Sequence, residues 1–429
     1  MLATSFAVLF GLLALTIPVA ACLFILAMTI DWAFAPAPLS LALGSQLWDT
    51  STNFILVSIP LFILIGELLL RAGIAGKVYD ALDSWLSWMP GGLMHANIGT
   101  ATMFSATSGS SVATAATVGT IALPQAPRFG YDERFFAGSI AAGGTLGILL
   151  PPSINLIIYG FLAQVSIPQL FMAGIVPGLM LSALFMLTIL VMCIVKPAWG
   201  GQRRTDTMAS RLSKLVHLGP VLILFGFIMG SIYSGWATPT EAAAIGTVVA
   251  LIMAFFAGGL SWRMIGEALE GTMRTTCMIM LILLAANFLN FVLASVGLTD
   301  EILGAIGTLD LSPMQTLFVL IAFYIVLGFF IETLSLMIIT IPLVAPLIVQ
   351  LGFDPIWFGI LLIVLIEMAL ITPPVGLNLF VVQGVRKRGN LMEVVVGAIP
   401  FVIAMFVMAM LLIAFPQIAL FLPEAAHGV

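Results

Sequence analysis

Long apolar runs separated by short polar segments make up most of the chain. A run of about twenty apolar residues is long enough to cross a bilayer as an α-helix. We predict nine such spans, at residues 6–30, 53–70, 135–162, 170–195, 215–233, 239–256, 275–296, 355–385 and 392–422. These runs are far longer than the ten-residue alternating strands of a transmembrane β-barrel. The pattern therefore predicts an all-α polytopic membrane protein.

Two further apolar runs, residues 95–124 and 314–348, do not read as simple spans. Each is close to two short helices in length, and each is interrupted by polar residues in its middle. The interruption is Ser108-Gly109-Ser110-Ser111 in the first run and Glu332-Thr333 in the second. We predict that both runs are re-entrant hairpins, which enter the membrane and return to the same side.

The positions of the basic residues support this topology. With nine spans, two hairpins and a cytoplasmic N-terminus, all 14 Lys and Arg residues fall in the segments 71–91, 125–134, 196–214, 258–274 and 386–391. Cytoplasmic loops are enriched in Lys and Arg, so these five segments are predicted to be cytoplasmic. The C-terminus then lies on the opposite, outer side of the membrane.

Composition excludes several classes of protein. With 62% hydrophobic and 8% charged residues, the chain does not have the composition of a soluble domain, of which about 25% would be charged. The three cysteines lie in separate apolar runs with no metal-binding spacing. No catalytic motif of a membrane-embedded hydrolase is present, so we predict that the chain is not an enzyme. We expect the lipid bilayer as a partner and no nucleic acid.

Two glycine- and serine-rich stretches, residues 105–111 and 143–155, interrupt the apolar sequence. Irregular backbone at membrane depth must be satisfied by protein, water or an ion, so it normally lines a cavity. The second stretch contains Pro151-Pro152, and a proline cannot donate a hydrogen bond to the carbonyl four residues earlier. We therefore expect the carbonyls of Gly147 and Ile148 to be free.

An internal repeat relates the two halves of the chain. A shift of 222 residues places Pro151-Pro152 on Pro373-Pro374, Asp132 on Asp354 and Ser111 on Thr333. Because the two hairpins are predicted to open from opposite sides, the repeats are inverted, as in secondary transporters that work by alternating access. We assign residues 1–214 to the first repeat, 215–238 to a linking helix and 239–429 to the second repeat.

Each repeat pairs a polar hairpin tip with a Pro-Pro break. Hydroxyl, carboxylate and carbonyl oxygens suit a hard cation such as Na⁺, so we predict two Na⁺ sites. The first comprises Ser108, Gly109, Ser110, Ser111, Thr145, Gly147 and Pro151, and the second Glu332, Thr333, Thr372, Pro374 and Gly376. The substrate is expected to contact Ser110, Ser111, Asn155, Glu332, Thr333 and Asn378. In the second break, Ala369 and Leu370 are the residues whose carbonyls we expect to be free.

Four stretches carry a recognisable resemblance: SATSGSSVATAATVGTIALP, AAGGTLGILLPPSINLIIYG, ATPTEAAAIGT and ITPPVGLNLFVV. Across nearly its whole length the chain resembles the large membrane subunit of tripartite ATP-independent periplasmic (TRAP) transporters. The resemblance implies a Na⁺-coupled importer of the elevator type for a small organic acid, located in the inner membrane of a bacterium, with the C-terminus in the periplasm. It also implies two partners, a periplasmic substrate-binding protein and a small four-helix membrane subunit, which we expect to be a separate chain. A self-sufficient Na⁺/dicarboxylate symporter of the same broad fold is the alternative.

Intramembrane carboxylates are costly and are therefore candidates for function. We expect Glu67 to pair with Arg71 and Glu241 to close a capping box with Thr238, which are both structural roles. Glu332 is expected to bind the ion or the substrate. For Glu367, a functional role and a role in holding the hairpin against the helix are both open. We further predict that residues 72–88 and 260–273 form interfacial helices.

Overall fold

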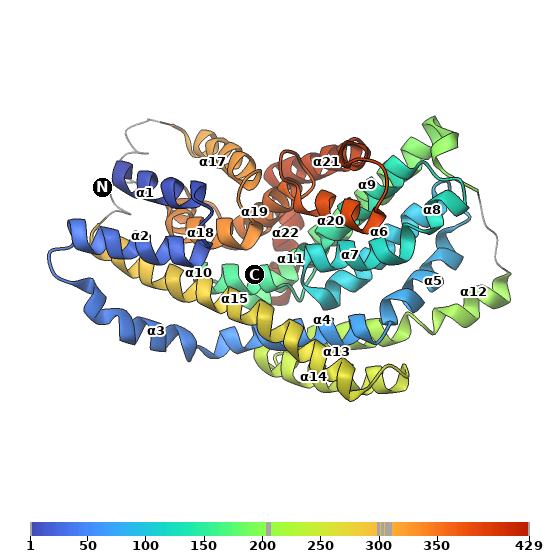
Figure 1. The fold of residues 1–429 in the computed structure, drawn as a ribbon, viewed down its shortest axis with the longest axis horizontal. Helices are drawn as coiled ribbons and strands as arrows, with labels where there is room; N and C mark the ends of the chain where they lie inside the picture. The colour runs from blue at the N-terminus through green and yellow to red at the C-terminus, as the bar shows by residue number, and fades with distance from the viewer. Residues whose placement is uncertain (1, 203–206, 298–300, 302–303, 305–310, 428–429) are drawn as a thin grey trace.

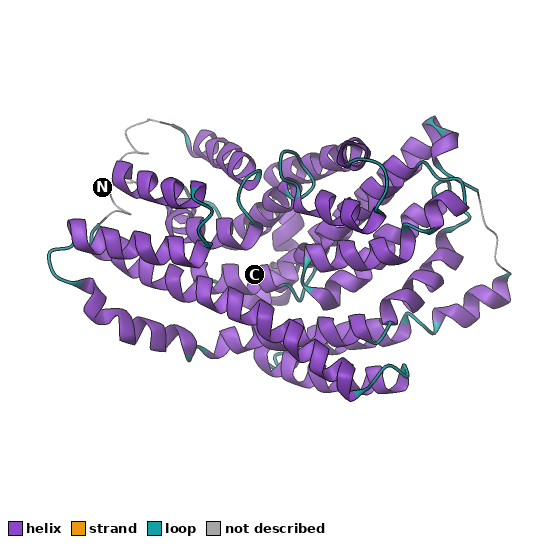
Figure 2. Ribbon diagram, in the orientation of Figure 1, coloured by secondary structure: helices purple, strands orange, loops and turns teal. Residues whose placement is uncertain are grey.

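A computed structural model describes residues 2–427 with the exception of 203–206, 298–300, 302–303 and 305–310. The described part is almost entirely helical, and no strand is formed within it (Figure 2). The longer helices are α1 (Leu2–Ala14), α2 (Val19–Phe34), α3 (Leu43–Ser51), α4 (Ser58–Arg71), α5 (Ile74–Leu86), α6 (Gly92–Ser108), α7 (Ser111–Ala122), α9 (Glu133–Leu149), α10 (Ile154–Ala163), α11 (Ile167–Val195), α12 (Met208–Leu215), α13 (Gly219–Tyr233), α14 (Pro239–Phe256), α15 (Trp262–Ser295), α17 (Pro313–Gly328), α18 (Thr333–Gln350), α19 (Pro355–Ala369), α20 (Leu377–Arg386), α21 (Leu391–Ala414) and α22 (Gln417–His427). A single short turn, α8 (Gln125–Arg128), precedes α9.

The helices have the length and composition of membrane spans. Within the described residues, seven helical stretches are long and apolar enough to cross a bilayer, and the α9–α10 pair, bent by 43°, is an eighth candidate. The prediction of an all-α polytopic membrane protein is confirmed. The orientation of the termini stays a prediction.

Four predicted helices differ from the structure. The first span is two helices, α1 and α2, because Pro18 begins a new helix after Thr16 adopts a left-handed conformation (φ 58°). The last span is also two helices, α21 and α22, which are separated at Phe415-Pro416. Conversely, the predicted interfacial helix at 260–273 and the span at 275–296 are one continuous 34-residue helix, α15, which contains no proline.

Both predicted hairpins are helix–turn–helix units. The first is formed by α6 and α7, with its turn at Gly109-Ser110, and the second by α17 and α18, with its turn at residues 329–332. The depth of these turns in the membrane stays a prediction.

The helix starts follow the 222-residue repeat. The second helix of each hairpin begins at Ser111 and at Thr333, and the next long helix begins at Glu133 and at Pro355. Asp132 and Asp354 cap these long helices with their side chains. Both Pro-Pro steps are cis peptide bonds, and each separates a long helix from a ten-residue helix. The two copies therefore share local structure as well as sequence, whereas their inverted orientation stays a prediction.

Two groups of helices lie side by side in Figure 1. The long-helix group consists of α2, α3, α4, α13, α14 and α15, in which α15 packs against α2, α3 and α4. The site group consists of α6, α7, α9, α19, α20 and α21, in which α9 packs against all five others. Gly138 of α9 and Gly397 of α21 face each other so closely that neither position has space for a Cβ atom. The site group thus holds the first hairpin against both broken helices.

Candidate functional site

The tip of the first hairpin is a tight turn. Gly109 adopts a left-handed conformation (φ 58°), which lacks a steric penalty for glycine. The next residue, Ser110, is the N-cap of α7, and its Oγ accepts a hydrogen bond from the backbone N–H of Ala113 at 3.3 Å. Ser111 is the first residue of α7 and points away from this cap, toward the second repeat.

Glycines of α9 allow the tip to approach the first broken helix. A Cβ atom at Gly147 would lie 2.8 Å from the carbonyl oxygen of Ser110, and one at Gly144 would lie 2.7 Å from Cβ of Ala115. Because these neighbours are backbone atoms and a short side chain, they could not move aside without moving the hairpin. The glycine-rich stretch therefore sets the distance between the tip and α9.

A hydrogen-bonded cluster joins the tip to the second broken helix. The hydroxyl of Ser111 lies 2.9 Å from Oε2 of Glu367 in α19 and 3.1 Å from the carbonyl oxygen of Gly144. Asn378 of α20 donates from Nδ2 to Ser111 Oγ at 3.0 Å and to the carbonyl oxygen of Ala141 at 3.3 Å. We call Ser111, Glu367 and Asn378 the central cluster. It brings together one residue of the first repeat and two of the second.

The central cluster is buried and only partly satisfied. Glu367 is 1% exposed, and Asn378 is fully buried. Oε1 of Glu367 and Oδ1 of Asn378 have no hydrogen-bond partner among the residues that the structure describes. Buried polar atoms are paired in the large majority of cases, so two unpaired acceptors in one cluster call for a donor or a cation. Glu367 also forms no ion pair with any residue that the structure describes.

The tip of the second hairpin is arranged differently. Glu332 is the N-cap of α18, and its Oε2 accepts hydrogen bonds from Ser335 N (3.1 Å) and Ser335 Oγ (3.2 Å). Thr333 is buried, and its Oγ1 has no partner among the described residues. Gly328 of α17 lies against Ala369, at the end of α19. The second tip thus also reaches a broken helix, although its carboxylate is used locally as a cap.

We expected the carbonyls next to the second Pro-Pro break to be free, but the structure shows that they accept hydrogen bonds. The backbone N–H of Thr372 donates to the carbonyl of Ala369 at 3.2 Å, and that of Asn378 donates to the carbonyl of Leu370 at 3.1 Å. The turn from Thr372 to Gly376 (φ 55°) folds back onto the end of α19, which supplies these donors. This part of the prediction is wrong. At the first break, by contrast, no described residue donates to the carbonyls of Gly147 and Ile148.

The remaining predicted site residues lie at varied places. Thr145 Oγ1 donates to the carbonyl of Ala142 at 2.6 Å and lies 3.9 Å from Met405 Sδ, so it faces α21 and not the tip. Thr372 Oγ1 donates to the carbonyl of Met368 at 2.6 Å.

The other predicted site residues differ in burial. Asn155 is buried in α10, and its Nδ2 has no described partner. Pro151 is buried, Pro374 is exposed, and the Ser108 side chain lies outside the described residues.

Sequence reasoning missed the contributions of Ala141 and Gly144, whose carbonyls enter the cluster. It also left open whether Glu367 has a functional role or holds the hairpin against the helix. The repeat could have indicated Glu367, because the 222-residue shift places it opposite Thr145 of the glycine-rich stretch.

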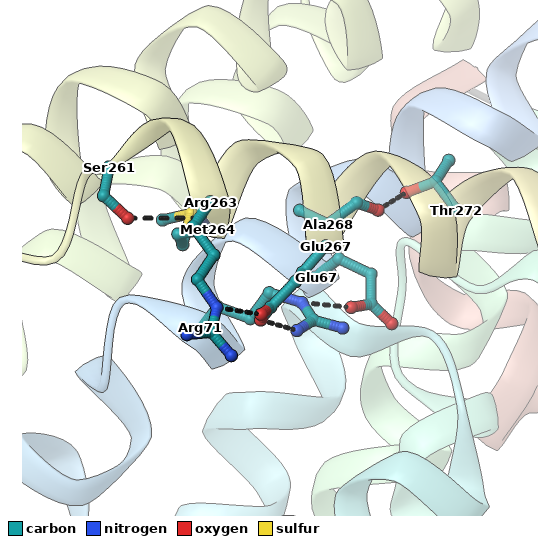
Figure 3. Close-up of polar contacts among 8 residues, drawn as sticks. All are labelled: Glu67, Arg71, Ser261, Arg263, Met264, Glu267, Ala268 and Thr272. Carbon is teal, nitrogen blue, oxygen red and sulfur yellow. Dashed lines mark hydrogen bonds and ion pairs between the residues drawn. The ribbon is translucent and has the colours of Figure 1, made fainter.

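Other intramembrane carboxylates have local partners. In Figure 3, Arg71 links two helices: its Nε lies 2.9 Å from Glu67 of the same helix, and its Nη1 lies 2.9 Å from Glu267 of α15. Arg263 completes this α4–α15 ion network by pairing with Glu267 at 2.9 Å. The predicted Glu67–Arg71 pair is confirmed, and so is the capping box of Thr238 and Glu241. Glu267 thus joins α15 to α4, whereas Glu67 and Glu241 have partners in or next to their own helices, and all three lie outside the central cluster.

Comparison with known protein families decides the class of the chain. Residues 6–418 match the family model described as the tripartite ATP-independent periplasmic transporter, DctM component. The chain belongs to the DctM family of TRAP transporters. The predicted resemblance is therefore confirmed.

Curated relatives match this chain over nearly its whole length. It is 35% identical to the C4-dicarboxylate TRAP transporter large permease protein DctM of Pseudomonas aeruginosa, with 89% of each chain covered. It is 30% identical to the sialic acid TRAP transporter large permease protein SiaM of Vibrio cholerae, with 90% of each covered. These relatives are transport proteins, which confirms the prediction that the chain is not an enzyme.

A solved structure supports the fold. The YdaH transporter of Alcanivorax borkumensis superimposes with a TM-score of 0.63 over 94% of this chain and 98% of its own, at 15% sequence identity. At that identity the likeness concerns architecture alone. A DctM-family chain thus has the fold of a transporter whose topology was described as unusual.

Proposed function

We propose that this large TRAP permease imports a small organic acid, driven by Na⁺, through an elevator-type alternating-access movement. The acid would be delivered by a periplasmic substrate-binding protein, and a small membrane subunit would complete the transporter. The C4-dicarboxylate and sialic acid relatives support a carboxylate as the substrate. The observation that carries the proposal is the central cluster, in which two buried acceptor oxygens receive no hydrogen bond from any residue that the structure describes.

The donor set of the cluster fits Na⁺ as the coupling ion. Na⁺ binds oxygen ligands, and the atoms left over are a carboxylate oxygen of Glu367 and an amide oxygen of Asn378. The carbonyls of Gly147 and Ile148 and the hydroxyl of Ser110 are the further oxygens that the first tip and the first break offer. A cation at this place would also compensate the charge of Glu367, which no described basic residue does.

A second Na⁺ would be held by the second tip. Thr333 Oγ1 is the buried oxygen without a described partner there, and Glu332 supplies a carboxylate one residue away. Thr372, Pro374 and Gly376 belong to the break beside it. We propose Ser110, Ser111, Asn155, Glu332, Thr333 and Asn378 as the groups around the substrate, between the two ions.

Two ions also suit the energetics of concentrative uptake. One Na⁺ entering down a tenfold gradient and about 100 mV releases about 3.7 kcal/mol. A monoanion moving inward against this potential costs about 2.3 kcal/mol. One ion would leave about 1.4 kcal/mol, a tenfold accumulation, whereas two would leave about 5 kcal/mol, more than a thousandfold.

Uptake by the reconstituted transporter tests the proposal. The complex of permease, small subunit and binding protein would be placed in liposomes, with the substrate first identified by thermal shift of the binding protein. We expect uptake that requires an inward Na⁺ gradient and the binding protein, with a Hill coefficient for Na⁺ above one. Uptake by the permease alone would support the self-sufficient symporter, and uptake independent of Na⁺ would contradict the proposed coupling.

A further inference from the structure

A separate cavity lies at the far ends of two helices that begin at the central cluster. It measures about 590 Å³ and is lined by residues from the C-terminal end of α7, from α8 and from the end of α20. Its lining comprises Thr120, Leu123, Pro124, Pro127, Gly384, Val385, Arg386, Lys387 and Arg388. We call it the basic pocket. A volume of this size is typical of small-molecule sites.

The charges around the basic pocket do not cancel. Arg386, whose side chain is 5% exposed, lies between Glu133 (3.0 Å) and Glu393 (2.8 Å), and Arg388 also pairs with Glu133 (3.1 Å). Lys387 is exposed and forms no ion pair with any residue that the structure describes. Three cations against two carboxylates leave one surplus positive charge, located at Lys387 and the outer face of Arg388. The pocket is therefore suited to one negative group.

The rest of the lining is apolar. Leu123 and Val385, with Pro124 and Pro127, form the surface next to the cations. A site with a cationic edge and an apolar wall suits an oxyanion carried on an apolar stem better than a small hydrated anion. The three basic residues lie in segment 386–391, which the distribution of charge places at the cytoplasmic face, where anionic lipid headgroups are concentrated.

We propose that the basic pocket binds a phosphate-type oxyanion, supplied by the headgroup of an anionic phospholipid. The phosphate contacts Lys387 and Arg388, and the glycerol and proximal acyl carbons cover Leu123, Pro124 and Val385. Because α7 and α20 carry Ser111 and Asn378 at their other ends, a bound lipid attaches the hairpin and the broken helix to the same membrane leaflet. The proposal does not depend on Na⁺ coupling or on the identity of the substrate.

Native mass spectrometry of the purified full-length chain tests this assignment. The chain would be titrated with phosphatidylglycerol or with phosphatidylcholine, as wild type and as Lys387→Gln and Arg388→Gln. Arg274→Gln is the matched control, since Arg274 is a highly exposed arginine of α15 that pairs only with Glu270 among the described residues. Competition by inorganic phosphate separates a lipid source from a soluble one.

We expect phosphatidylglycerol to bind more tightly than phosphatidylcholine. Each of Lys387→Gln and Arg388→Gln should weaken phosphatidylglycerol binding about fivefold, which corresponds to about 1 kcal/mol per basic residue. Arg274→Gln should leave binding unchanged. Equal binding of the two lipids, or equal losses in all three variants, would overturn the proposal. Displacement of the lipid by millimolar phosphate would support the oxyanion chemistry and assign the pocket to a soluble anion.

Discussion

The two Pro-Pro breaks occupy equivalent sequence positions but have opposite surroundings. Pro151 and Pro152 are buried, and the carbonyls of Gly147 and Ile148 receive no hydrogen bond from the described residues. Pro373 and Pro374 are exposed, and the equivalent carbonyls are bonded to Thr372 and Asn378. The repeated Pro-Pro motif therefore determines where each helix is interrupted. The packing around each copy determines whether its backbone carbonyls are available to bind a ligand.

The hairpin tips show the same contrast. Ser111 is hydrogen-bonded across to Glu367 and Asn378, whereas the hydroxyl of Thr333 has no partner among the described residues and Glu332 caps its own helix. The first tip is held by the second repeat, and within the part of the chain that the structure describes no comparable hydrogen bonds hold the second tip. We infer that the first site is the more preorganised of the two.

The largest effect is expected from adding a side-chain atom where the first tip lies directly against α9. Gly147→Ala would place Cβ 2.8 Å from the Ser110 carbonyl, so the tip must move. Because displacing a binding group by about 1 Å can cost about 100-fold in rate, we expect Na⁺-dependent uptake to fall by about that factor. The control is Gly226→Ala on α13, where a Cβ meets no atom within 4 Å. Equal uptake by the two variants would show that the close approach has no role.

A smaller effect is expected from neutralising carboxylates. Glu367→Gln keeps the shape of a buried side chain but removes its charge, so the Na⁺ concentration for half-maximal uptake should rise at least about tenfold, or about 1.4 kcal/mol. Glu332 is exposed, so Glu332→Gln should raise it about threefold. Glu270→Gln, at an exposed ion pair, is the control. If Glu332→Gln had the larger effect, the second Na⁺ site, and not the first, would be the more preorganised of the two.

Removing the hydroxyl of Ser111 or of Thr333 tests how much the hydrogen bonds of each hairpin tip contribute to the free energy of unfolding. Ser111→Ala leaves Glu367 and Asn378 with fewer partners and should cost about 1 to 3 kcal/mol of unfolding free energy. Thr333→Val replaces a hydroxyl without a described partner by a methyl group of the same shape and should cost less than about 0.5 kcal/mol. Thermal unfolding in Na⁺-free detergent solution measures both. Equal destabilisation by the two substitutions would contradict the hydrogen-bond difference.

The smallest effect is expected in the α4–α15 ion network. Glu267→Gln weakens contacts of Arg71 and Arg263 that are open to solvent, so the cost in stability should be below about 1 kcal/mol. Na⁺ dependence of uptake should not change. A change in the Na⁺ dependence would mean that the network acts on the central cluster.

Local sequence patterns predicted much of this architecture. Apolar run length identified most of the helices, polar interruptions identified both hairpins, and the Pro-Pro steps identified both breaks, because prolines and capping aspartates act on their own backbone. The split at Pro18 was missed because the apolar run continues past it. The continuity of α15 was missed because one of its polar residues, Glu267, pairs with Arg71, which is far away in sequence.

The site was less predictable, since its contacts cross between repeats. Hydroxyls and Pro-Pro steps indicated Ser111 and the breaks, yet no local pattern pairs Ser111 with Glu367, which lies 256 residues away. The direction of Thr145 toward Met405 likewise depends on how α9 packs on α21. Sequence thus identified the elements of the site, and tertiary packing selected which of their oxygens face one another.

Equilibrium binding of ²²Na⁺ to the purified permease tests the central claim most directly. The claim is that one Na⁺ site lies at each hairpin tip, with Ser111 at the first and Thr333 at the second. We predict two ions per wild-type chain and one per chain in each of Ser111→Ala and Thr333→Ala. Two ions retained in both variants, or no saturable binding by the wild type, would contradict it.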